Sequence, residues 1–76
     1  MHAAPLSSPR LQRVLAVLAD GKPHTTREIV RKGRVMAVSA CVSELRHHGA
    51  EIECWSVIVG GKRVFFYKMT KGPKNG

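Results

Sequence analysis

The hydrophobic repeat of this chain changes once, at Gly49, and that change limits the folds available to it. Before Gly49, apolar residues recur every three or four positions, which is the period of an amphipathic helix. After it, the stretches 52–59 and 63–69 are rich in β-branched and aromatic residues with a period of two. Gly60-Gly61 separates these stretches and predicts a two-residue hairpin turn. We therefore expect an α+β fold of three helices followed by a two-stranded β-hairpin.

Local signals place the three helices. The first is expected to begin at Ser8-Pro9, because serine caps helices and proline suits the first helical position. The second follows Thr25-Thr26-Arg27-Glu28, a capping-box sequence, and is expected to end at Gly33 in a left-handed cap. The third is expected over 36–48. The apolar stripes of these helices predict a core made of Leu11, Val14, Leu15, Leu18, Ile29, Val30, Val38, Cys41, Val42 and Leu45.

The hairpin turn also predicts the pairing of its strands: Val59 faces Lys62, Val57 faces Val64, Trp55 faces Phe66 and Cys54 faces Tyr67. One face is expected to contact the helices and comprises Ile52, Cys54, Phe65, Tyr67 and Met69. The opposite face carries Trp55, Val57, Val64 and Phe66. A contiguous apolar patch of this kind often marks an interface, so we expect homodimerisation or a larger protein partner. The alternatives are that a terminal segment covers the patch or that it is tolerated in water.

A chain of 76 residues is expected to form one small domain, here over 8–69. Segment 1–7 is predicted to be a flexible N-terminal segment, and 70–76 a basic flexible tail. No apolar run reaches the roughly 18 residues of a membrane span, and the first residues do not follow the pattern of a secretory signal. We therefore expect an intracellular protein without a membrane partner.

Charge is the strongest global signal. Thirteen Lys and Arg stand against five Asp and Glu, which gives a net charge of +8. Such a surplus in a small domain favours a polyanionic partner, most often nucleic acid. The alternative is a basic surface that only keeps the protein soluble. A lipid surface is disfavoured because we find no lipid-facing amphipathic helix.

Cys41, His47, His48 and Cys54 raise the question of a metal or redox site. Their spacing does not match a zinc finger, and both cysteines fall at positions expected to be buried. The sequence also offers no nucleophile with a base, no glycine-rich phosphate loop and no acidic pair of the kind nucleases use. We therefore expect no metal, no cofactor, no small-molecule substrate and no enzymatic activity.

The free face of the third helix carries small and polar side chains, namely Met36, Ala40, Ser43, Glu44 and His47, with Ser39 and Arg46 beside them. Such a face lets a helix enter a DNA groove about 12 Å wide, although it is also compatible with simple solvation. The pattern TTREIVRKG…VSACVSELRHHGAEIEC…YKM, over about residues 9–69, resembles the small winged helix-turn-helix domains of phage and mobile-element proteins. The resemblance implies binding to double-stranded DNA, with recognition helix 36–48 in the major groove and wing 59–63 on the backbone.

The resemblance further implies sequence-specific transcriptional regulation in a phage or mobile element, in the cytoplasm of a bacterial host and at its nucleoid. It assigns base contacts to Arg34, Ser39, Ala40 and Ser43, and backbone contacts to Arg27, Arg31, Lys32, Arg46, His47, Lys62 and Arg63. Glu44 would pair with a base-contacting arginine or remain a solvated charge.

Two other functions stay open. Winged helices also serve as protein-interaction modules, for which the face of Trp55, Val57, Val64 and Phe66 would be the contact surface. RNA binding is disfavoured, because we expect no aromatic stacking platform on an exposed sheet.

Overall fold

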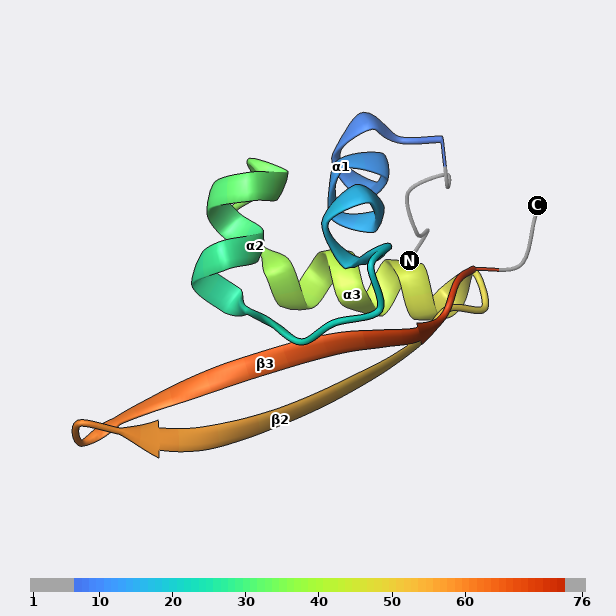
Figure 1. Cartoon of the computed structure of the whole chain (residues 1–76). Helices are drawn as coiled ribbons and strands as arrows, with labels where there is room; N and C mark the ends of the chain where they lie inside the picture. Colours follow the sequence, from blue (N-terminus) through green and yellow to red (C-terminus); the bar gives the residue numbers. More distant parts are fainter. Residues whose placement is uncertain (1–6, 74–76) are drawn as a thin grey trace.

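The structure is a computed structural model and describes residues 7–73. Three helices and a three-stranded antiparallel sheet are present, which confirms the α+β class (Figure 1). The predicted flexible ends fall mostly on residues 1–6 and 74–76, outside the described residues. The last strand continues to Lys71, two residues past the predicted end of the domain. The elements in chain order are α1 (Pro9–Leu18), β1 (His24–Thr25), α2 (Thr26–Gly33), α3 (Val38–His47), β2 (Glu51–Val59) and β3 (Lys62–Lys71).

The N-termini of α1 and α2 are capped in different ways. Ser8 holds the N-cap position of α1, but its side chain makes no cap bond; its carbonyl accepts the first intrahelical bond, from the N–H of Gln12 at 3.0 Å. At α2 the predicted cap is confirmed, because Thr25 Oγ1 accepts from the N–H of Glu28 at 3.1 Å. The Glu28 carboxylate contacts His24 and Lys32 instead of completing the capping box.

The end of α2 differs from its prediction. Gly33 is the last helical residue and is buried, so the expectation that it takes the left-handed cap is wrong. Arg34 takes that conformation instead, with φ 52° and ψ 46°. A Cβ at Gly33 would lie 3.6 Å from Val14 Cγ2, an ordinary contact distance, so α2 packs against α1 here with room for a methyl group. The Nε of Arg13 donates to the Gly33 carbonyl at 2.8 Å, which satisfies a carbonyl left open by the helix end.

Helix α3 begins at Val38, two residues later than predicted, and leaves Met36 exposed before it. It ends at His47, one residue before the predicted end, and Gly49 closes it as predicted. Gly49 has φ 96° and its N–H donates to the Arg46 carbonyl at 3.0 Å, while the Ala50 N–H donates to Leu45 at 3.0 Å. These two bonds form a Schellman motif, in which glycine supplies the left-handed residue.

The sheet has the order β1-β3-β2. All four predicted pairs of β2 and β3 are confirmed, because Gly60 and Gly61, at φ 56° and 79°, form the two-residue turn that fixes the register. Strand β1 was not predicted; His24 pairs with Tyr67, and Thr25 with Phe66. A strand of two residues is too short to show an alternating apolar and polar pattern in the sequence.

The core lies between the helices and one end of the hairpin. Val30 is exposed and Leu15 only partly buried, contrary to their prediction. Of the hairpin face expected to contact the helices, Ile52 and Tyr67 are buried and Met69 packs on the core, but Cys54 and Phe65 are exposed. The fully formed core comprises Leu11, Val14, Leu18, Ile29, Val35, Val38, Cys41, Val42, Leu45, Ala50, Ile52 and Tyr67.

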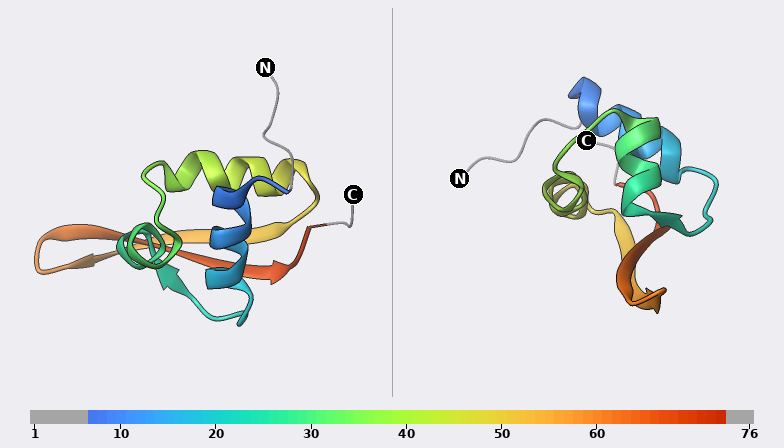
Figure 2. Two further views of the ribbon diagram at one scale, coloured as in Figure 1. Left: turned by 90° about the horizontal axis from the view of Figure 1, so that it is seen from above. Right: turned by 90° about the vertical axis from the view of Figure 1, so that its left-hand side faces the viewer.

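Element lengths explain the exposed part of the hairpin. A ten-residue helix such as α1 or α3 is about 15 Å long, whereas a nine-residue strand such as β2 spans about 30 Å. The hairpin therefore runs past the helices at one end, on the side where α3 begins (Figures 1 and 2). Below, the root of the hairpin means residues 51–54 and 67–71, and the tip means residues 55–66.

Candidate nucleic-acid interface

Helix α3 presents one face to the core and the other to solvent. Val38, Cys41, Val42 and Leu45 are buried, as predicted. The solvent face has the spacing i, i+1, i+4, i+7 and i+8, which places its residues on one side of a helix. It consists of Ser39, Ala40, Ser43, Arg46 and His47, all exposed. The structure therefore leaves open a face of three small side chains, one arginine and one histidine.

Glu44 does not belong to this face. Its carboxylate pairs with Arg10 of α1, whose Nη2 lies 2.6 Å from Oε2 and 2.7 Å from Oε1. Neither role expected for Glu44 is found, because Arg10 is not among the predicted base contacts and the charge is neutralised and half-buried. The solvent face of α3 consequently carries no acidic side chain.

Two adjoining grooves connect the start of α3 to the hairpin. One is lined by Thr25, Thr26, Arg27, Arg63, Val64 and Phe65. The other is lined by Thr26, Met36, Ala37, Val38, Ser39, Phe65 and Tyr67. Because Thr26 and Phe65 line both, the two grooves form one continuous surface, which we call the groove surface. It brings together three predicted DNA contacts from three elements: Arg27, Ser39 and Arg63. Arg31 lines a further groove beside Arg27.

Phe65 is the groove residue that sequence reasoning misplaced. It was expected against the helices, yet it is 43% exposed, at the centre of the groove surface. Comparing the strand and helix lengths would have placed it beyond the helical layer.

Other predicted contacts lie elsewhere or are partly engaged. Arg34 and Lys32 line a separate groove beside α1, together with Arg13, Ala16, Val17, Asp20 and His24. Lys32 also pairs with Glu28, with 3.2 Å between Nζ and Oε2. Arg46 donates from Nη2 to the carbonyl of Ile52, and so ties the end of α3 to the hairpin. Lys62 and Arg63 are exposed at the tip.

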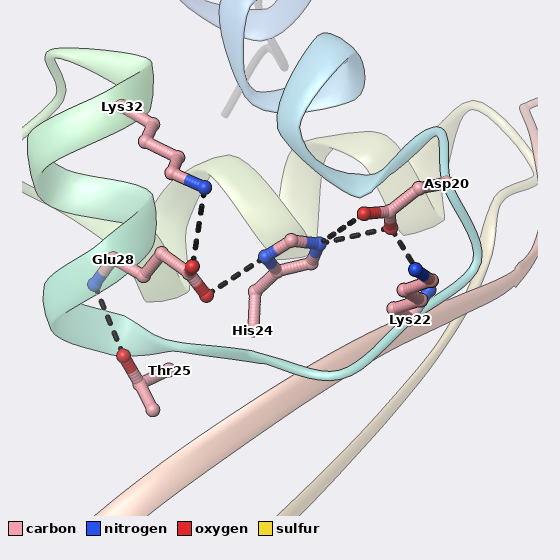
Figure 3. Close-up of polar contacts among 6 residues, drawn as sticks. All are labelled: Asp20, Lys22, His24, Thr25, Glu28 and Lys32. Atoms are coloured by element: carbon pink, nitrogen blue, oxygen red, sulfur yellow. Dashed lines mark hydrogen bonds and ion pairs between the residues drawn. The ribbon is translucent and has the colours of Figure 1, made fainter.

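His24 is a buried polar residue that the sequence analysis overlooked. Its Nδ1 lies 2.8 Å from Glu28 Oε1, and its Nε2 lies 2.9 Å from Asp20 Oδ1 (Figure 3). Burial lowers the pKa of His24, but the hydrogen bonds to both carboxylates outweigh it and raise the pKa. The same bonds lower the pKa of Asp20 and that of Glu28, in each case with the His24 bond as the main cause. The spacing of four residues on either side of His24 was the available signal.

Each acidic side chain thus contacts a basic side chain or stands opposite one in the hairpin register. Asp20 and Glu28 contact His24, Glu44 pairs with Arg10, and the remaining two stand opposite lysines in the hairpin register, Glu51 with Lys71 and Glu53 with Lys68. Among the exposed Lys and Arg within residues 7–73 that take part in no ion pair, four lie on α2 or at the hairpin tip. They are Arg27, Arg31, Lys62 and Arg63.

The outer face of the hairpin is the second feature that binding could use. Trp55 and Phe66 stack with their ring centroids 5.8 Å apart and their planes 9° apart. Trp55 is 37% and Val57 40% exposed, while Val64 and Phe66 are half-buried, so the predicted apolar patch is present. RNA was disfavoured because no aromatic stacking platform was expected on an exposed sheet; the exposed rings of Trp55 and Phe65 weaken that argument.

Cys41 is buried as predicted, and burial raises the pKa of its thiol. Cys54 is exposed, against its prediction; it lies opposite Tyr67 in the register, at the boundary where the root of the hairpin meets the tip. Both cysteines are free. Among the residues that the structure describes, no three His, Cys, Asp or Glu side chains are grouped to hold a metal ion. No helix in the described part of the chain is long and apolar enough to cross a membrane.

The fold and surface define an α+β domain of three helices and a three-stranded antiparallel sheet, with exposed unpaired cations on α2 and at the hairpin tip among others. Comparisons with protein-family models, curated proteins and solved structures find no match.

Proposed function

We propose that this chain is a winged helix-turn-helix domain that binds double-stranded DNA. In this proposal α3 enters the major groove, and the hairpin tip is the wing that lies on the backbone. The observation that carries it is the groove surface, where Arg27 and Arg63, both without an acidic partner, flank the start of a helix whose free face is small and polar.

Helix α3 suits close approach to bases. An α-helix with its side chains is about 10–12 Å across, and the major groove is about 12 Å wide. Small side chains at Ser39, Ala40 and Ser43 reduce the width of the face that would enter, and serine hydroxyls bond either bases or phosphates. Arg46 and His47, at the other end of this face, would lie near the backbone.

The unpaired cations Arg27, Arg31, Lys62 and Arg63 would contact phosphates. Such contacts position a protein without reading sequence, and they supply affinity by releasing counterions. Assignment of Arg34 to a base rests on the sequence resemblance, since its side chain lines a different groove. A regulatory role in a phage or mobile element rests on the same resemblance.

The test is a fluorescence-anisotropy titration with a random-sequence 24-mer duplex at salt concentrations from about 50 to 200 mM. For about five phosphate contacts we expect a log–log slope of about −4 to −5. Arg63→Ala should reduce the magnitude of this slope by about one. Lys22→Ala is the matched control, because it removes the same charge from the turn after α1, outside the groove surface. Absence of binding at low salt, or equal effects of both variants, would contradict the proposal.

A second function, as a protein-interaction module, is favoured by the exposed stack of Trp55 on Phe66. Binding through this face would be nearly independent of salt, since it would depend on apolar contacts. The same titration with a single-stranded RNA of equal length tests a third function, RNA binding. Binding that is tighter to RNA than to DNA, and is lost in Trp55→Ala, would replace the DNA proposal.

A further inference from the structure

Strand β2 lies at the edge of the sheet, and within residues 7–73 no strand pairs with its outer side. Proteins protect such edges with lysines, prolines or bulges, because an open edge pairs with other strands. The other edge, that of β3, is partly covered by β1 and carries Lys62, Arg63, Lys68 and Lys71. In β2 there is no Lys or Arg, and the run from Cys54 to Val59 contains neither charge nor proline. This edge is therefore unprotected along the tip.

The register identifies which backbone groups point outward. In a two-residue hairpin the residues flanking the turn, Val59 and Lys62, form a hydrogen-bonded pair, and bonded pairs then alternate along the ladder. Odd-numbered residues of β2 consequently bond to β3, and even-numbered ones direct N–H and C=O to the open edge. The carbonyl of Ile52 follows this rule, because it accepts from Arg46 instead of from β3. The groups that remain open belong to Cys54, Ser56 and Ile58.

We propose that a second copy of this chain pairs antiparallel with β2 along this edge, about a two-fold axis at Ser56. In this register Ser56 of one copy lies opposite Ser56 of the other, and Cys54 lies opposite Ile58. All outward N–H and C=O groups of these three residues are then used, and the Ile52 carbonyl keeps its bond to Arg46. An interface of this kind is self-complementary, as a two-fold axis requires.

Side chains on the outer face fit the same pairing. Trp55 of one copy lies opposite Val57 of the other, and adjacent cross-strand side chains pack within about 5 Å. The two half-exposed apolar pairs of each hairpin therefore join into one surface, shared between copies.

Charge also selects a second copy in the antiparallel direction. The root end of β2 carries Glu51 and Glu53, and the turn end is followed by Lys62. Antiparallel pairing brings the acidic end of one strand beside the lysine of the other, at both ends of the interface. The other helices and strands of eight residues or more all carry Lys or Arg, so β2 is the element along which two chains of net charge +8 approach with least repulsion. This pairing does not depend on DNA binding.

Site-specific cross-linking tests the axis. Hydrogen-bonded antiparallel residues have Cα atoms about 5.5 Å apart, within the range that a disulfide spans. In a Cys54→Ser background, Ser56→Cys should form a covalent dimer under mild oxidation, and Ser43→Cys on α3, equally exposed, should not. Equal yields for the two variants would overturn the proposal. Faster cross-linking of the wild-type chain through Cys54 than of Ser56→Cys would place the axis elsewhere and overturn the register.

Mass in solution tests the pairing itself. Sedimentation equilibrium of the wild-type chain should give about twice 8.4 kDa. Ser56→Lys should give a monomer at the same concentration, because it places two like charges opposite each other at the axis. Ser43→Lys, which adds the same charge to α3, should remain dimeric. A wild-type monomer at about 1 mM, larger aggregates, or dissociation of both variants would contradict the inference.

Discussion

Each end of the hairpin carries an isoleucine on the same face, and these two isoleucines lie in opposite environments. Ile52 at the root is 7% exposed, whereas Ile58 at the tip, on the same strand and the same face, is 65% exposed. The two side chains are identical, so hydrophobicity does not explain the difference in exposure. The reach of the helices does, because they cover only the root. An apolar strand is buried where another layer lies over it, and the uncovered part is available for binding.

The largest expected effect comes from truncating the three isoleucines of the chain. Ile29→Ala in the fully buried core should lower the free energy of unfolding by about 2–5 kcal/mol. Ile52→Ala at the root should fall at the lower end of that range, and Ile58→Ala should change it by less than about 0.5 kcal/mol. Urea unfolding followed by circular dichroism, at a concentration where the chain is monomeric, measures all three. A cost for Ile58→Ala equal to that for Ile52→Ala would show that the tip is covered in solution.

Replacing glycine by alanine should lower stability at the hairpin tip and raise it at the end of α2. Gly61 has φ 79°, so Gly61→Ala should cost about 1–2 kcal/mol of stability through left-handed strain. Gly33 is helical, and a Cβ there would make an ordinary contact with Val14. Gly33→Ala should therefore raise stability by up to about 1 kcal/mol. Thermal unfolding of both variants checks the pair; a loss at Gly33 would mean that α1 and α2 pack more tightly than the distance of 3.6 Å indicates.

The smallest effect should be a pH dependence of stability, confined to the surroundings of His24 and the root of the hairpin. The pKa of His24 is raised, so its contribution to stability is complete below its usual value of 6.5 and is lost as pH rises through the raised pKa. The lowered pKa values of Asp20 and Glu28 act in the other direction, since their contributions are lost as pH falls below 3.8 and 4.5. Stability should be highest between about pH 4.5 and 6.5.

Hydrogen exchange at pH 6 and pH 8, corrected for its intrinsic pH dependence, measures this contribution. Protection near Tyr67, which pairs with His24, should decrease at the higher pH, and protection at the tip should not. His24→Gln should abolish the difference in protection between pH 6 and pH 8. The other charged side chains around His24, namely Lys32, Arg34 and Arg13, are unchanged in this variant. A uniform change along the hairpin would contradict a local origin.

The sequence predicted the hairpin better than the rest of the fold. Two glycines in a two-residue turn permit one register, so the pairs of β2 and β3 followed directly. Strand β1 did not, because it consists of two residues whose strand partner, β3, lies about forty positions further along the chain. The pair of Arg10 and Glu44 joins residues 34 positions apart and leaves no local pattern.

The candidate site was predictable in parts. Helical periodicity gave the free face of α3, except for Glu44 at its margin. The meeting of Arg27 with Arg63 was not predictable from local pattern, since it depends on how far the hairpin runs beneath α2. The strand bounds were predicted nearly as observed, so the missing information was how much of the strands the helices cover.

The uncovered hairpin also has a mechanical consequence. Beyond the helices the sheet is a ribbon of two strands, held at its root by Ile52 and Tyr67. Six or seven residues of strand make a lever about 20 Å long. A rotation of about 10° at the root then displaces the turn at Gly60-Gly61 by about 3 Å, close to the rise of one strand residue. The packing of two buried side chains thus sets where the tip points, and a change in their volume would be felt at the turn as a displacement.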